Sequence, residues 1–183
     1  MTNLDRVLDI VSGPLPAAGV DGLVIGGFAV NHYGYARNTL DVDIMIAAEH
    51  LDAVRTLMAK AGFTNVAVEE NVAVFRMPDS APRVDFLRVD AETMRKLLAG
   101  AVDVRVHGYP LKVPALKDLI AMKIFSLSQD MARRLGKDLP DLAYLTVLHE
   151  LDLESDIRPL CDRFGTAEVY DLIRKQVEAL RAS

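Results

Sequence analysis

Strand-like segments occur only in the first 114 residues of this 183-residue chain, and every later segment has the spacing of a helix. Short β-branched runs closed by glycine or proline predict strands in the first part. In the second part, apolar residues recur at helical spacing, which predicts helices over 115–129, 138–150, 155–164 and 166–181. We therefore predict an α/β (α+β) domain over 1–114, with a mixed sheet flanked by helices, and a helical bundle over 115–183.

The first domain is predicted to alternate strands with helices. Its strands are expected over 23–25, 41–46, 66–68, 72–77, 83–89, 102–106 and 111–113. Its helices are expected over 4–11, 28–33, 51–62 and 94–98. The pair Gly26-Gly27 then forms the turn between a strand and a helix.

Charge and cysteine content exclude several classes of protein. The formal net charge of −5 argues against a protein dedicated to duplex DNA, which needs many Lys and Arg contacts to phosphate. The single cysteine, Cys161, cannot form an intramolecular disulfide. No stretch approaches the ~18 apolar residues of a membrane span, and the N-terminus has no basic region followed by an apolar core. We expect a cytoplasmic protein.

Two carboxylates stand one residue apart in the predicted strand Asp41-Val42-Asp43-Ile44. Side chains at i and i+2 of a strand point to the same face, so Asp41 and Asp43 can offer hard oxygen ligands to one divalent cation, best Mg²⁺. The alternative is a solvated strand face, because acidic residues also protect edge strands from aggregation.

A glycine pair after a buried strand allows close approach of the backbone to a phosphate. Gly26 and Gly27 have that position, although a tight turn without a ligand would use the same residues. A dinucleotide-binding loop fits less well, because the segment lacks the G-x-G-x-x-G spacing.

A two-metal site for nucleotidyl transfer needs a third carboxylate, and Asp85 is the candidate. It lies between Val84 and Phe86 in a strand whose neighbouring residues favour burial. Asp79 and Asp90 stand at strand ends, where aspartates of solvated turns are expected.

These segments resemble the DNA polymerase beta-type nucleotidyltransferase superfamily, in particular its minimal bacterial branch. The resemblance spans roughly the first half of the chain and rests on residues 24–29, 34–44 and 84–87. It is greatest to the abortive-infection type toxins and the lincosamide nucleotidyltransferases, which share a Gly-Gly turn, an Arg-x-Thr-x-Asp-x-Asp segment and a later helical Lys-Asp signature. The broad superfamily has Gly-Ser, whereas Gly27 supplies only its backbone amide.

The resemblance implies a metal-dependent nucleotidyltransferase that moves a nucleoside monophosphate from an NTP to an acceptor. Its catalytic residues and ligands of Mg²⁺, or alternatively Mn²⁺, would be Asp41, Asp43 and Asp85. The nucleotide would be bound by Gly26, Gly27, Arg37, Thr39, Lys123, Lys137, Asp138 and Asp141. The acceptor could be an RNA 3′ end, a protein or a small hydroxylated molecule, and a toxin of a toxin–antitoxin system would also have a partner protein.

Several candidate residues of the helical half have a structural alternative to nucleotide binding. Lys123 falls on the apolar stripe of its helix, where it would either bind the triphosphate or extend its ammonium to water past a packed stem. Asp138 is equally well placed as a helix N-cap, and Asp141 would favour the positive end of the helix dipole. Residues 112–137 are rich in Lys and Arg, which could bind phosphates or RNA or form a solvated face.

A second function remains compatible with the same residues. A catalytically silent nucleotide-binding or regulatory partner, similar to an antitoxin, would keep the fold without turnover. The two functions separate at Asp85, because a binder tolerates its loss and a transferase does not.

Overall fold

The computed structural model describes residues 2–39, 41–69, 71–78 and 83–182. The chain divides into two compact units. Unit 1 comprises Met1–Ala29 and Arg37–Ala115, and unit 2 comprises Val30–Ala36 and Leu116–Ser183. The second unit therefore includes a short segment from the first fifth of the chain.

Unit 1 is built on a five-stranded mixed sheet with the strand order β1-β2-β5-β4-β3. β2 and β5 are parallel, whereas the other neighbours are antiparallel. A separate hairpin contains β6 and β7. The strands are β1 (Leu23–Val24), β2 (Val42–Ala47), β3 (Thr64–Val68), β4 (Val72–Arg76), β5 (Arg83–Val89), β6 (Val102–Val106) and β7 (Tyr109–Val113).

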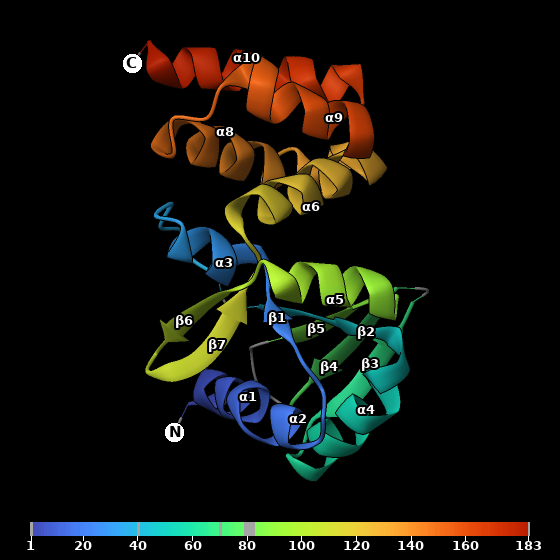
Figure 1. Ribbon diagram of the computed structural model, residues 1–183. Helices are drawn as coiled ribbons and strands as arrows, with labels where there is room; N and C mark the ends of the chain where they lie inside the picture. The colour runs from blue at the N-terminus through green and yellow to red at the C-terminus, as the bar shows by residue number, and fades with distance from the viewer. Residues whose placement is uncertain (1, 40, 70, 79–82, 183) are drawn as a thin grey trace. The chain divides into compact units, whose positions relative to one another are not determined.

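Helices cover the sheet of unit 1. Figure 1 shows α5 on one side of the sheet and α1, α2 and α4 on the other. The apolar positions of these elements form a buried core, in which the Phe75 and Phe86 rings meet edge to face at 5.6 Å. The helices are α1 (Asn3–Ser12), α2 (Pro14–Ala17), α4 (Leu51–Lys60, after the 3₁₀ turn Ala48–His50) and α5 (Ala91–Ala99).

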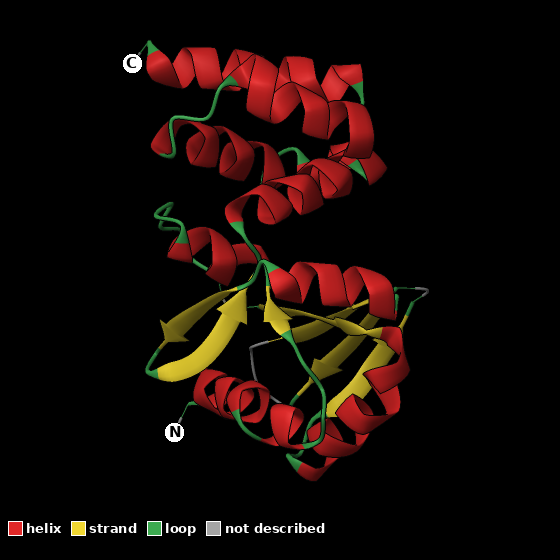
Figure 2. Ribbon diagram, viewed as in Figure 1, coloured by secondary structure: helices red, strands yellow, loops and turns green. Residues whose placement is uncertain are grey.

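Unit 2 is helical (Figure 2). Its helix α8 packs against α6 and α10, and α9 packs against α6. A side chain at Gly165 would place its Cβ 2.7 Å from Ile124 Cγ2, so a glycine lets the end of α9 approach α6. The elements are α6 (Leu116–Gln129), α7 (Met131–Arg134), α8 (Asp138–Leu148), the π turn Leu153–Ile157, α9 (Arg158–Phe164) and α10 (Ala167–Arg181).

The structure confirms the mixed sheet flanked by helices and the helical C-terminal part. It differs at α3 (Gly26–His32), which begins at the glycine pair instead of after it. It also shows the short helices α2 and α7, each of only four residues and too short for a helical period to reveal. None of the described helices is long and apolar enough to cross a membrane.

The segment Val30–Ala36 is held in unit 2 by aromatic contacts. Tyr35 stacks on Tyr144 with the ring centroids 4.2 Å apart and an interplanar angle of 8°. His149 Nε2 donates a hydrogen bond of 2.8 Å to the carbonyl oxygen of Tyr33. These partners lie more than 100 residues apart in the sequence, so local periodicity does not predict them.

Cys161 lies fully buried in α9, and burial raises the pKa of its thiol to about 11. Because the thiolate is the nucleophile, a rise of about two pKa units lowers the reactive fraction about 100-fold at pH 8. We expect iodoacetamide to label the native protein far more slowly than the urea-unfolded chain, as followed by intact mass. Equal rates in the two states would contradict the burial of this thiol.

Candidate functional site

Parallel pairing of β2 with β5 brings two of the predicted carboxylates side by side. Asp43 and Asp85 are register partners on these neighbouring strands. Arg83 stands two residues before Asp85 and shares its face of β5. Asp41 directly precedes β2, and its charge acts on Arg83. The start of this ladder therefore gathers Asp41, Asp43, Asp85 and a cation.

Arg83 forms a bidentate ion pair with Asp85. Its Nε lies 2.5 Å from Oδ1 and its Nη2 lies 2.6 Å from Oδ2, in side chains that are 32% and 14% exposed. The hydrogen bonds to Asp85 are the largest cause of a raised pKa for Arg83, and the charges of Asp85, Asp41 and Asp43 raise it further. Arg83 thus lies within the electrostatic field of all these carboxylates.

Gly26 lies against the carboxylate of Asp43. Its φ is +60°, and a Cβ built on it would lie 2.0 Å from Asp43 Oδ2. The backbone N–H of Ile25 donates to the carbonyl oxygen of Asp43 at 2.9 Å, which ties this turn to β2. Glycine is required here both by the left-handed backbone and by the close approach of Asp43.

Gly27 makes a similar contact with Thr39. A Cβ on Gly27 would lie 2.7 Å from Thr39 Cβ and Oγ1. The Thr39 hydroxyl donates a 3.2 Å hydrogen bond to the carbonyl oxygen of Asp41. Arg37 is half-buried in the segment that leads to β2. The structure therefore brings Gly26, Gly27, Thr39, Asp41, Asp43 and Asp85 together within unit 1.

The donor atoms of this site suit a hard divalent cation, because all of them are carboxylate oxygens. The missing side chain of Gly26 leaves the backbone close to Asp43 Oδ2. However, the described ranges contain no group of three or more His, Cys, Asp or Glu arranged to hold a metal ion. Both oxygens of Asp85 are engaged by Arg83 instead. The chemistry of the residues fits Mg²⁺, and the Arg83 pair withholds one ligand.

Other predicted residues form a separate buried cluster in unit 2. Lys123 Nζ lies 2.9 Å from Asp138 Oδ1 and 2.6 Å from Asp141 Oδ2. Lys123 is only 5% exposed, Asp138 3% and Asp141 0%. Because both carboxylates belong to α8, Lys123 has a structural role in joining α6 to α8. Lys137, at the start of α8, is exposed.

The sequence allows Asp138 to be the N-cap of its helix, but the structure does not place it there. Lys137 occupies the cap position, and Asp138 is the first helical residue. Its Oδ1 accepts from Lys123, and its buried Oδ2 has no hydrogen-bond partner in the described part of the chain. By contrast, Asp90 caps α5 by accepting from the backbone N–H of Thr93 at 2.8 Å, as expected for a turn aspartate. Asp79 lies outside the described residues.

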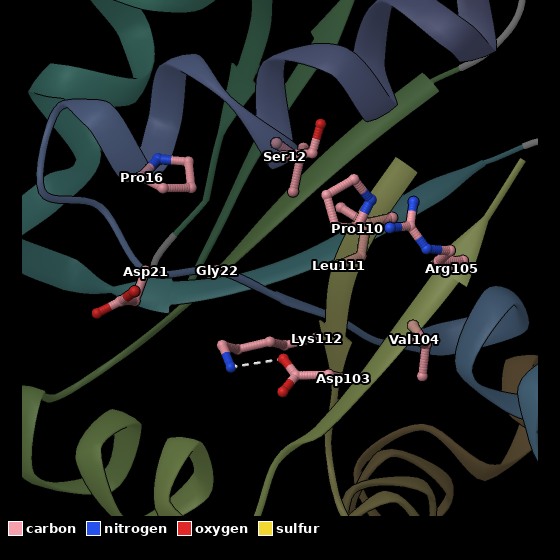
Figure 3. Close-up of a pocket in the computed structure, with 11 residues that line it drawn as sticks. Ser12, Pro16, Asp21, Gly22, Asp103, Val104, Arg105, Pro110, Leu111 and Lys112 are labelled. Carbon is pink, nitrogen blue, oxygen red and sulfur yellow. Dashed lines mark hydrogen bonds and ion pairs between the residues drawn. The ribbon is translucent and has the colours of Figure 1, made fainter. Parts of the chain in front are cut away.

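A hollow in unit 1 involves none of these residues. It has a volume of about 490 Å³ and lies between the end of α1, the segment before β1 and the hairpin β6–β7 (Figure 3). Three of its charged lining residues are engaged locally, because Lys112 bonds Asp103 at 2.7 Å and Arg105 donates to the carbonyl oxygen of Gly108 at 2.8 Å. We assign no chemistry to it.

The profile of the family described as nucleotidyl transferase of unknown function (DUF2204) matches residues 4–156. The chain belongs to this family. The match includes every residue of the β2–β5 site. The resemblance to nucleotidyltransferases that the sequence indicates is thereby confirmed.

Solved structures of nucleotidyltransferases share the fold of this family member. The antibiotic-resistance factor ANT(2″)-Ia in solution is 13% identical, with a TM-score of 0.58 over 100% of this chain and 95% of that chain. The lincomycin-bound lincosamide antibiotic adenylyltransferase LnuA is 14% identical, with a TM-score of 0.56 over 81% of this chain and 98% of that chain. An antigenic nucleotidyltransferase-like protein from Paracoccidioides brasiliensis is 19% identical, with a TM-score of 0.54 over 93% of each chain. No curated protein matches the sequence.

Arg83 is the site residue that the sequence analysis missed. It stands two positions before Asp85, so the period of two that places Asp41 with Asp43 also places Arg83 with Asp85. An arginine two residues before a candidate acid on the same strand is the sequence signal that could have indicated an ion pair with that acid.

Replacing Lys123 with Met should destabilise this nucleotidyl transferase family member by about 3–5 kcal/mol, because the change removes the buried cation that two buried carboxylates share. Urea unfolding measures the difference. Lys117→Met is the matched control, since Lys117 is exposed on the same helix. A loss below about 1 kcal/mol for Lys123→Met would show that the cluster does not support the fold.

Gly26→Ala should cost more stability than Gly19→Ala, although both glycines have positive φ. An added Cβ finds open space at Gly19 but meets Asp43 at Gly26. We expect Gly26→Ala to lose about 1–3 kcal/mol more in urea unfolding. Equal losses would mean that backbone strain alone explains Gly26.

Proposed function

We propose that this protein transfers a nucleoside monophosphate from an NTP to an acceptor, with Mg²⁺ as the metal and Mn²⁺ as an alternative. The observation that carries the proposal is the β2–β5 register, which sets Asp43 beside Asp85. Asp41 lies just before β2, and Gly26 contacts the carboxylate of Asp43. Membership of a nucleotidyl transferase family supports this reaction class.

Asp41, Asp43 and Asp85 would hold the divalent metal, which when bound supplies positive charge to stabilise the developing negative charge on the phosphates. Asp85 would also accept the proton of the attacking hydroxyl. In the transfer, the acceptor oxygen forms a bond to the α-phosphorus, the bond to the β-phosphate oxygen breaks, and pyrophosphate leaves.

The donor nucleotide would be bound by residues around the glycine pair. Gly26 and Gly27 lack side chains that would bar a phosphate from the backbone. Arg37 and Thr39 lead into β2 and can offer a guanidinium and a hydroxyl. Lys137 is exposed in unit 2, and its contact with phosphate stays a prediction from the resemblance. The burial of Lys123, Asp138 and Asp141 favours a structural role over nucleotide contact.

We propose a small hydroxylated molecule as the first acceptor to test. Two proteins that share the fold are ANT(2″)-Ia, described as an antibiotic-resistance factor, and a lincomycin-bound lincosamide adenylyltransferase. An RNA 3′ end and a protein side chain are the other arms of the same screen. A toxin role with a partner protein would require transfer to a cellular RNA or protein.

One observation favours the second function, a silent nucleotide-binding partner. Asp85 is already paired through both oxygens with Arg83. A protein that keeps this pair in the nucleotide complex would bind an NTP without turning it over. Binding and pyrophosphate release must therefore be measured separately.

We expect at least one of the four ribonucleoside triphosphates to raise the melting temperature of the protein, and to do so only when Mg²⁺ is present. A ligand at 100 times its Kd stabilises the native state by about 2.7 kcal/mol, which is several degrees for a protein of this size. Asp43→Asn should abolish the increase. Asp21→Asn, an exposed aspartate of the same unit, should retain it.

The outcomes separate the two functions. Stabilisation followed by pyrophosphate release with an acceptor supports the transferase. Stabilisation without release from any acceptor class supports the silent partner. No stabilisation by any triphosphate, or full stabilisation of Asp43→Asn, contradicts the proposed site.

A further inference from the structure

The ion pair of Arg83 with Asp85 involves the carboxylate that the proposed reaction needs as its third acid. Two guanidinium nitrogens hold the two carboxylate oxygens at 2.5 and 2.6 Å. A cation that binds Asp85 must therefore displace at least one of these hydrogen bonds or lie next to a full positive charge. Either event costs binding energy, since hydrogen bonds between charged groups are the stronger kind.

Asp85 is paired with Arg83, and the described residues form no three-carboxylate cluster. The register places its backbone directly beside Asp43, but its side chain is paired with Arg83. The carboxylates are therefore neighbours along the ladder without converging on one point.

Arg83 cannot leave Asp85 by losing its proton, because arginine remains charged in proteins. Hydrogen bonding to Asp85 and the nearby aspartates raise its pKa further. A divalent cation therefore has to compete with this guanidinium for Asp85. Arg83 is 32% exposed and begins its strand, so its side chain borders solvent.

We propose that Arg83 is a positioning residue that holds Asp85 while no divalent cation is bound and yields it when the cation binds. Arg83 thereby lowers the metal affinity of the site and couples metal binding to the placement of the third acid. This inference rests on the proposed function, because it takes Asp41, Asp43 and Asp85 as the metal ligands.

The first test is Mn²⁺ binding without nucleotide, measured by electron paramagnetic resonance of the free ion. Arg83→Gln should bind Mn²⁺ about tenfold more tightly than the native protein, because the competing guanidinium is gone. Arg83→Lys keeps the charge but loses the bidentate pairing, so its affinity should lie between the two. Thermal melts establish that each variant is folded.

The matched control is Arg76→Gln. Arg76 is exposed on β4 and is the register partner of Arg83 on β5, so its loss removes the same charge from the neighbouring strand without removing a hydrogen bond to Asp85. Its Mn²⁺ affinity should stay within about twofold of the native value.

A second readout follows the pair directly. The Nε–H resonance of Arg83 in a ¹⁵N-labelled protein should report its hydrogen bond to Asp85 and should shift or broaden on addition of diamagnetic Mg²⁺. Arg158 is an internal control, because it pairs with Glu154 in unit 2 through the same Nε and Nη2 groups at 2.5 and 3.0 Å. The Arg158 resonance should not move.

The failure of this inference is distinguishable from failure of the proposed function. Equal Mn²⁺ affinity in Arg83→Gln and native protein, with an unmoved Arg83 resonance, overturns the exchange but leaves the metal site intact. Weaker binding by Arg83→Gln also overturns it. Absence of Mn²⁺ binding in every variant, and with NTP added, overturns the metal site and the exchange together.

Discussion

The parallel pairing of β2 with β5 is the constraint on which the rest of the structure depends. It joins the antiparallel pair β1–β2 to the three antiparallel strands β5, β4 and β3 in one mixed sheet. The same pairing aligns Asp43 with Asp85. A slip of one residue would turn Asp85 to the opposite face and expose Phe86, which is fully buried. Burial of the core therefore also fixes the alignment of the acids.

Electrostatic repulsion is the cost of that alignment, and the structure offsets it locally. Neighbouring carboxylates on one strand face repel each other, and Arg83 supplies the compensating charge. Gly26 contributes in another way, since its missing side chain lets the turn lie against Asp43. The site is thus assembled by two strands and one turn of unit 1.

Much of the candidate site follows from a period of two in the sequence. Asp41 and Asp43 alternate with apolar residues, and Asp85 interrupts an apolar strand, so short-range pattern suffices to find them. The ion-pair partners of these side chains cannot be predicted from a short-range sequence pattern. The rotamer of Asp85, the pairing of Lys123 with two acids and the cap position of Lys137 depend on contacts between segments far apart in the chain. The fold class was predictable because strands and helices segregate along the sequence, whereas the membership of Val30–Ala36 in unit 2 rests on Tyr35 and His149, whose contacts have no local signature.

The assignment of Val30–Ala36 to unit 2 makes the helical unit discontinuous in the sequence. The polypeptide passes between the units after Ala29, after Ala36 and after Ala115. Cutting the chain after Ala115 would therefore not release a complete helical unit, because Tyr144 would lose its stacking partner and His149 its hydrogen-bond acceptor. A fragment that preserves these contacts has to carry residues 30–36 as a separate peptide or through a circular permutation, and two halves divided at residue 115 become complementing fragments instead of independent domains.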